Sequence, residues 1–233
     1  MNQLRLLAKL EGLRNRNSTN HQFINKDLYR MLYDEDIYII AYNAIKSNHG
    51  AETKGADGTS LNGFCMEWVH ETISTLKDES YKPLPNKTQL IPKKNGKMRK
   101  LGFPNGKDKL LQEAIRIILE CIYEPTFSDY SHGFRPNRST QTAMAQIENW
   151  HGTSWFIEGD ISACFDEIDH RILESIRASE LQMSGLFVSL TKCSAPDTST
   201  CNMNFTEQIP ERRKAPPVVQ FLLTSISINS TVL

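Results

Sequence analysis

The sequence WFIEGDISACFDEIDH, which runs from Trp155 to His170, decides how the rest of the chain is interpreted. It begins with three bulky residues that favour a buried β-strand, Trp155 to Ile157. Gly159 lets backbone or substrate come close, and Asp160 stands where this strand is expected to end. A carboxylate at the end of a buried strand is costly unless it binds a cation, so Asp160 is a candidate metal ligand. The alternative is an ordinary loop aspartate.

This stretch resembles motif A of the right-hand polymerases, in the form found in group II intron-encoded reverse transcriptases and maturases of the organellar type. The resemblance implies that Asp160 is catalytic and holds Mg²⁺, with the backbone carbonyl of Ile161 as a further ligand. It also implies that the ring of Phe165 lies under the sugar of the incoming nucleotide. The chemistry is suitable, because Mg²⁺ prefers oxygen ligands and two such ions can clamp a phosphoryl transfer.

A basic segment runs from Asn86 to Lys109. It holds eight Lys or Arg residues and one Asp, a local charge of +7, although the whole chain has 27 basic and 27 acidic residues. Residues 88–91 and 98–103 have the composition of two short strands, and Asn95-Gly96 is a hairpin-turn signal. We therefore expect a β-hairpin that turns at Asn95-Gly96 and presents cations to phosphate. The alternative is a solvated loop.

Within this segment, IPKKNGKMRKLG resembles the fingertip hairpin of the same family. The resemblance implies that Lys93 and Arg99 contact the phosphates of the nucleotide, and Lys94 and Lys97 are candidate template contacts. Arginine suits such a role because its planar guanidinium binds phosphate oxygens in pairs. The family usually has proline after this arginine, whereas this chain has Lys100.

A third segment, SHGFRPNRST from Ser131 to Thr140, contains the HGFRPxRS signature of the same family. Its basic residues lie in a turn before an expected helix from Thr140 to Trp150. Basic groups near a helix start favour a nearby anion, because the helix N-terminus adds its own partial positive charge. We expect Arg135 and Arg138 to contact template RNA or nucleotide. The alternative for Arg135 is a structural ion pair.

The other expected elements are helices. Met1 to Arg16 has leucines at positions 4, 7, 10 and 13 among basic residues, so it is either a weak organellar presequence or an ordinary first helix. Asn25 to Asn48, Leu61 to Lys77 and Asp108 to Tyr123 show helical spacing of apolar residues. The expected caps are Asn25 or Asp27 for the first of these and Asp108 for the last.

The three quoted motifs occur in family order, and the resemblance covers about Asn20 to Ile176. We expect an α+β fold with an N-terminal helical extension at 1–50 and reverse transcriptase fingers with the beginning of the palm at 51–177. Residues 178–233 are expected to be an unassigned, non-homologous and poorly ordered tail. Its origin in a frameshift, an unspliced intron or a true truncation stays open.

The resemblance implies an RNA-directed DNA polymerase that copies intron RNA and assists splicing, with intron RNA, a DNA primer and dNTPs as partners. The YADD or FADD turn of the family is absent from the sequence, so we expect this chain alone to be inactive as a polymerase. The alternatives are a non-catalytic intron RNA-binding module and an inactive remnant of a decayed reading frame.

Five cysteines without zinc-ligand spacing favour a reduced compartment, and no run of 18 apolar residues predicts a membrane span. The expected location is the mitochondrion, with the bacterial cytoplasm as the alternative.

Overall fold

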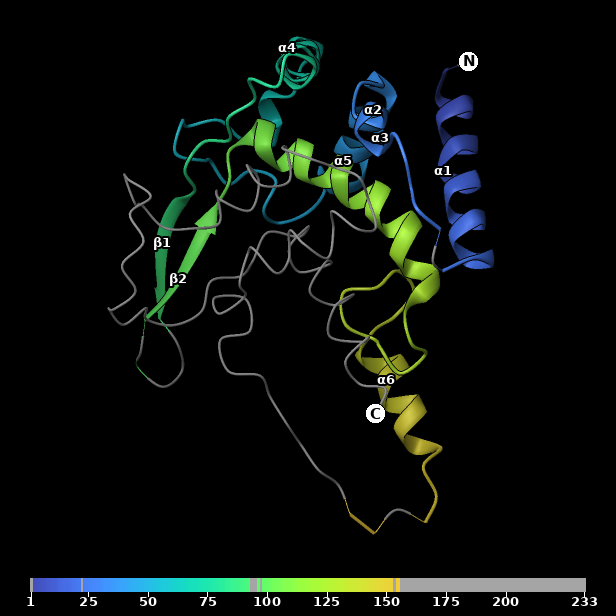
Figure 1. Ribbon diagram of the computed structural model, residues 1–233. Helices are drawn as coiled ribbons and strands as arrows, with labels where there is room; N and C mark the ends of the chain where they lie inside the picture. Colours follow the sequence, from blue (N-terminus) through green and yellow to red (C-terminus); the bar gives the residue numbers. More distant parts are fainter. Residues whose placement is uncertain (1, 22, 93–95, 97, 153, 156–233) are drawn as a thin grey trace, which may run out of the picture.

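The computed structural model describes residues 2–21, 23–92, 96, 98–152 and 154–155. Within these ranges, a group of helices stands beside one antiparallel pair of strands (Figure 1). This mixture of helix and sheet agrees with the expected α+β class. Every helix in the described ranges is too short or too polar to cross a bilayer. In chain order the elements are α1 (Asn2–Thr19), α2 (Leu28–Met31), α3 (Glu35–Ile45), η1 (Leu61–Gly63), α4 (Met66–Lys77), β1 (Lys87–Pro92), β2 (Met98–Phe103), α5 (Gly106–Tyr123), η2 (Glu124–Thr126) and α6 (Thr140–Glu148).

Helix α5 is the centre of the described core. It runs diagonally through the molecule, and α1, α3 and α4 all contact it (Figure 1). Its apolar side chains recur at intervals of three and four residues, which puts them on neighbouring faces of the helix. The buried ones are Leu110, Leu111, Ala114, Ile115, Ile118, Leu119 and Ile122. Helix α5 begins at Gly106, two residues before the predicted start at Asp108. Its N-cap is Asn105 rather than Asp108.

Helix α1 packs on α5 through a different leucine stripe from the one expected. Leu6, Leu10 and Leu13 are buried, whereas Leu4 and Leu7 are exposed. Positions 6, 10 and 13 lie on one face of a helix with 3.6 residues per turn, and the face that meets α5 selects them. Arg14 adds an ion pair to α5, with its Nη2 atom 3.7 Å from Oε1 of Glu120. The N-terminal segment is therefore a helix that packs into this core.

The segment from Asn25 to Asn48 is two helices instead of one. Asp34 caps α3, because its side chain accepts the N–H of Asp36 at 3.2 Å. Asp27 precedes α2 with a φ of 58° and makes no side-chain cap. Asn25 instead pairs with Asn17 of α1 in the core, and each side-chain amide donates to the other's oxygen at 3.0 and 2.9 Å. The interruption of the helix before Asp34 thus lets α2 and α3 pack separately.

The loop at residues 50–60 closes over the start of α5. Thr59 accepts the N–H of Gly106 on Oγ1 at 3.2 Å, which satisfies one of the unpaired groups of a helix N-terminus. Lys109 donates back to the carbonyls of Gly50 and Thr53 at 2.9 and 2.5 Å. A Cβ atom on Gly55 would stand 2.4 Å from Cα of Asn105. Only glycine therefore allows the loop to lie this close to the helix.

We predict that Gly55→Ala lowers the free energy of unfolding by roughly 1–3 kcal/mol, because the new methyl group meets backbone that cannot rotate away. Gly50→Ala is the matched control in the same loop, since a Cβ atom there has no heavy atom within 4 Å. Urea denaturation of both variants measures the difference. Equal midpoints for the two variants would show that the loop does not pack on Asn105 as described.

A candidate nucleic-acid interface

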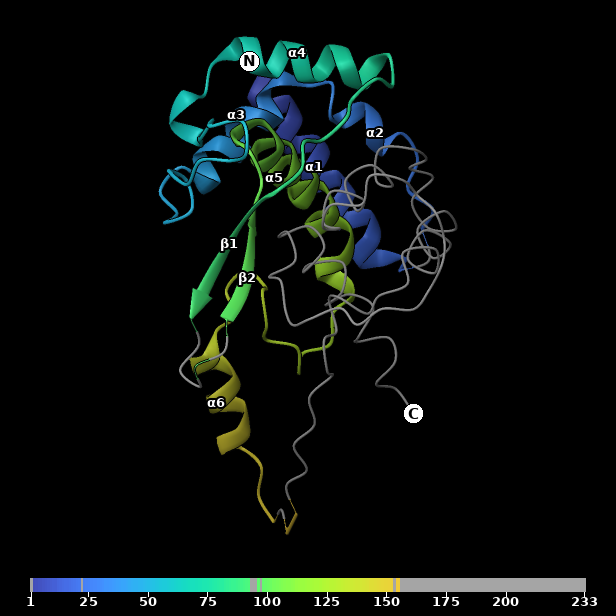
Figure 2. The same ribbon diagram turned by 90° about the vertical axis from the view of Figure 1, so that its left-hand side faces the viewer.

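The expected β-hairpin is present. β1 and β2 pair antiparallel from Lys87 opposite Phe103 to Pro92 opposite Met98. β1 extends one residue further at each end than predicted, and β2 has the predicted bounds. Gly96 has a φ of +78°, a conformation that favours glycine and suits the expected turn. The hairpin extends away from α4 and the start of α5 as an arm (Figure 1), a course that is also seen from the side in Figure 2, and every residue of β1 is exposed.

Most of the predicted site residues lie outside the described residues. For the hairpin they are Lys93, Lys94 and Lys97 together with the side chain of Arg99, and for the catalytic stretch they are Asp160, Ile161 and Phe165. The pairing of Pro92 with Met98 does assign the three lysines to the segment that connects the strands, and it places Arg99 opposite Ile91. In the described part of the chain, no group of His, Cys, Asp or Glu side chains is arranged to hold a metal ion.

Arg135 lies inside the loop between η2 and α6. Its Nε and Nη2 atoms donate to Oε1 of Glu124 at 3.1 and 2.9 Å. Its Nη1 atom donates to the carbonyls of Ser128 and Ser131 at 2.7 and 2.9 Å. The guanidinium also lies 5.1 Å from the ring centre of Phe127. With 6% of its side chain exposed, Arg135 organises this loop, as the ion-pair alternative expected. Contact with template stays a prediction.

Arg138 has a different environment three residues later. Its Nη2 atom is 3.1 Å from Oδ1 of Asp129, whose side chain is 88% exposed. An ion pair with so exposed a partner contributes little and exchanges readily with other anions. The Arg138 side chain is itself 30% exposed. Of the two arginines, Arg138 is therefore the one available to a phosphate group.

The residues just before each of these arginines have an uncommon backbone conformation. Phe134 has a φ of 57° and Asn137 a φ of 59°, values that non-glycine residues rarely adopt. Phe134 is nevertheless 67% exposed, so burial of its ring does not explain the conformation. The contacts of Arg135 with Ser128 and Ser131 close the loop around it and stabilise this geometry.

Helix α6 is attached to the same loop by polar contacts. Ser139 caps it in a reciprocal arrangement with Thr142, and it ends at Glu148, two residues before the expected end. His132 contacts the hydroxyl of Thr142 at 2.9 Å and the side-chain oxygen of Gln146. His132 thus links the loop to α6. The sequence did not predict Glu124 as the partner of Arg135 or Gln146 as the partner of His132, because neither pair is adjacent in the chain.

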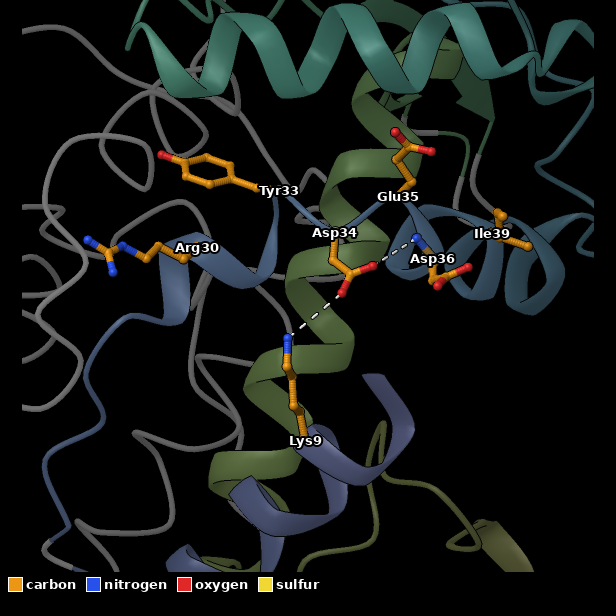
Figure 3. A pocket seen from close by; sticks show the side chains of 7 residues that line it. All are labelled: Lys9, Arg30, Tyr33, Asp34, Glu35, Asp36 and Ile39. Atoms are coloured by element: carbon orange, nitrogen blue, oxygen red, sulfur yellow. Dashed lines mark hydrogen bonds and ion pairs between the residues drawn. The ribbon is translucent and has the colours of Figure 1, made fainter. Parts of the chain in front are cut away.

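A hollow of about 430 Å³ lies between α1, α2 and the start of α3 (Figure 3). Lys9 reaches into it and stands 4.0 Å from Asp34, and the Asp34 side chain also binds the N–H of Asp36. Because its carboxylates repel phosphate, this hollow is not a candidate nucleotide site. Its lining residues are Lys9, Arg30, Tyr33, Asp34, Glu35, Asp36 and Ile39.

Comparison with known families gives a match over residues 91–211 to the model described as "Reverse transcriptase (RNA-dependent DNA polymerase)". The match covers just over half of the 233 residues. It includes the second half of the hairpin arm, the Arg135 loop and the stretch around Asp160. It continues past Ile176, the expected end of the resemblance, into the segment from residue 178 that was expected to be non-homologous.

The relatives include the group II intron-encoded protein LtrA of Lactococcus lactis, which is 45% identical over 80% of this chain and 32% of its own length. An uncharacterized 91 kDa protein in the cob intron of Schizosaccharomyces pombe is 41% identical over 76% of this chain and 22% of its own. Nuclear intron maturase 1, mitochondrial, of Arabidopsis thaliana is 38% identical over 32% of this chain and 11% of its own. The chain spans a third or less of these relatives. It belongs to the reverse transcriptase (RNA-dependent DNA polymerase) family, and the relatives it resembles include group II intron-encoded proteins.

Proposed function

We propose that this chain supplies the fingers and the beginning of the palm of a group II intron reverse transcriptase that copies intron RNA into DNA and assists splicing. The observation that carries the proposal is the β1–β2 arm. It is a paired hairpin whose connecting segment holds Lys93, Lys94 and Lys97, in a chain of this family. An exposed arm with clustered cations suits binding to the phosphates of a nucleic acid or a nucleotide.

Within this proposal the cations have two kinds of partner. Lys93 and Arg99 bind the phosphates of the incoming dNTP, and Phe165 lies under its sugar. Lys94, Lys97 and Arg138 contact the RNA template. Arg135, which we also expected at the template, supports the interface by holding the loop that carries Arg138. The exposed ion pair of Arg138 supports its part, because Asp129 gives way to a phosphate at little cost.

The proposed cofactor is Mg²⁺, held by Asp160 and the backbone carbonyl of Ile161. A carboxylate and a carbonyl oxygen are the ligand types that Mg²⁺ prefers. When bound, the metal would neutralise charge on the phosphate groups. Asp160 supplies one negative charge, and the sequence contains no adjacent pair of aspartates to supply more.

We also propose the mitochondrion as the location. The name of the Arabidopsis relative, which includes that compartment, supports this, whereas the Lactococcus relative supports the bacterial cytoplasm as the alternative.

A second candidate function is a non-catalytic module that binds intron RNA. The loop that carries Arg135 and Arg138 favours it, since Arg135 is held by Glu124 while Arg138 pairs with the exposed Asp129, which a phosphate can replace. Such a module binds RNA through phosphate and shape contacts and needs no complete catalytic centre. Both functions require RNA binding, and only the first requires Asp160.

We predict that the chain binds single-stranded RNA with an affinity that falls steeply as salt rises. The slope of log affinity against log salt is negative, and each lost phosphate contact reduces its magnitude by about 0.7, so Lys94→Ala with Lys97→Ala reduces it by about 1.4. Lys46→Ala is the control, because Lys46 is an exposed cation at the end of α3, bonded to Asn43. Fluorescence anisotropy over a salt series gives the slopes. A salt-independent affinity would contradict the proposal.

We predict opposite effects for the two arginines of the loop. Arg138→Ala weakens RNA binding and costs less than about 1 kcal/mol of stability, because its ion pair is exposed. Arg135→Ala costs about 3 kcal/mol, because it leaves the part-buried Glu124 carboxylate without its partner. Urea denaturation and RNA titration of both variants separate the two roles. Equal stability losses would contradict the assignment of Arg135 as the organiser of the loop.

We predict that the 233-residue chain by itself does not extend a DNA primer on an RNA template with Mg²⁺ or Mn²⁺. Two-metal transfer needs several carboxylates, and motif A supplies only Asp160. Primer extension on a sequencing gel is the measurement, with full-length LtrA as the positive control. Extension by the chain, if abolished in Asp160→Ala, would show that other residues of this chain complete the metal site.

A further inference from the structure

One buried carboxylate joins both ends of the hairpin arm to α5. The carboxylate of Asp108, a residue only 3% exposed, accepts the Tyr81 hydroxyl and the N–H of Leu84 at 3.1 Å. It also accepts the side-chain amide of Asn105 at 2.9 Å. Tyr81 and Leu84 precede β1, and Asn105 follows β2. The segments that enter and leave the arm therefore meet at a single side chain.

Asp108 is itself held at the start of α5. Asp108 lies in the first turn of α5, and its own N–H donates to Oδ1 of Asn105 at 2.7 Å. A negative charge in the first turn of a helix is favoured by the helix dipole. Burial raises the pKa of the Asp108 carboxyl, and its hydrogen bonds with Tyr81, Leu84 and Asn105 oppose that rise. The three donors thus offset the cost of burying the carboxylate.

Within the described residues, the arm is held mainly at its base. β1 is exposed along its whole length, and the part-buried side chains described for β2 are its last three, Leu101 to Phe103. A two-stranded hairpin with so little buried surface is only marginally stable and can tilt about its base. The bonds at its base therefore determine where its far end lies.

We propose that Asp108 is a positioning residue, which fixes the angle of the β1–β2 arm on α5 and so places the cations of residues 93–97 against the phosphates of bound RNA. The anchoring of the arm follows from the contacts of Asp108 alone. The placement against phosphate rests on the proposed function.

The test compares two tyrosine variants with the same chemical change. Tyr81→Phe removes one hydrogen bond to Asp108 and keeps the ring and the carboxylate. Tyr29→Phe is the matched control, because it removes one partly buried hydroxyl that donates to the carbonyl of Leu76 at 2.7 Å, between two helices. Asp108→Asn serves as a second variant, which keeps the shape of the side chain and removes its charge.

The first measurement is hydrogen exchange at the base of the arm, in peptides that cover residues 82–87 and 100–106. We expect Tyr81→Phe to speed exchange there by about fivefold, the effect of one hydrogen bond, while Tyr29→Phe leaves it unchanged. Asp108→Asn is expected to have a larger effect in the same peptides. Exchange that is unaltered in both arm variants would overturn the anchoring role.

The second measurement asks whether anchoring positions the cations. Lys94→Ala is expected to weaken RNA binding less in the Tyr81→Phe background than in the unmodified chain, because a misplaced arm has less contact to lose. The Tyr29→Phe background leaves the effect of Lys94→Ala intact. Additive effects of Tyr81→Phe and Lys94→Ala would overturn positioning and leave Asp108 with a structural role only. If the unmodified chain does not bind RNA, the proposed function fails, and hydrogen exchange still decides the anchoring.

Discussion

The unpaired N–H groups at the start of α5 are the constraint on which the described structure depends. A helix leaves its first N–H groups without partners inside the helix, and a buried helix start must find acceptors for them elsewhere. Here the acceptors come from two directions, Oγ1 of Thr59 for Gly106 and Oδ1 of Asn105 for Asp108. The loop at 50–60 and the hairpin arm therefore meet at one point of the core, although long stretches of chain separate them.

The sequence predicts the parts of the fold that local signals determine, and it misses parts that contacts between elements determine. The hairpin follows from local signals, the Asn95-Gly96 dipeptide and two short strand-like runs, so its strands agree with the prediction to within one residue at each end. The helix from 106 to 123 follows from its apolar period. The break at Asp34 was missed, because the predicted helix ran through the residue whose side chain caps α3. The buried face of α1, with Leu6, Leu10 and Leu13, is decided by packing against α5. Local pattern shows that a helix is amphipathic, and its neighbours select the face.

For the candidate site, the sequence predicts which residues belong to the motif better than it predicts the role of each. Arg135 and Arg138 stand three residues apart in one motif, and the sequence alone suggests a similar role for both. The structure separates them through their partners, a part-buried Glu124 and a highly exposed Asp129. These partners lie eleven and nine residues from their arginines, and a carboxylate at such a distance gives no periodic signal. The stretch around Asp160 was identified by its motif, and its residues from 156 onward lie outside the described ones. Trp155, which was expected to begin a buried strand, is 87% exposed.

The reciprocal pair of Asn17 and Asn25 has a consequence for how this family can diverge. Both side chains are buried, and each amide satisfies the donor and the acceptor of the other. Replacing one asparagine by an apolar residue leaves the other with unmet hydrogen-bonding groups, whereas replacing both with apolar residues of similar shape is nearly neutral. Single substitutions at either position are therefore disfavoured intermediates. Related chains are expected to keep both asparagines or to have lost both, so that positions 17 and 25 co-vary and mark the contact between α1 and the segment before α2.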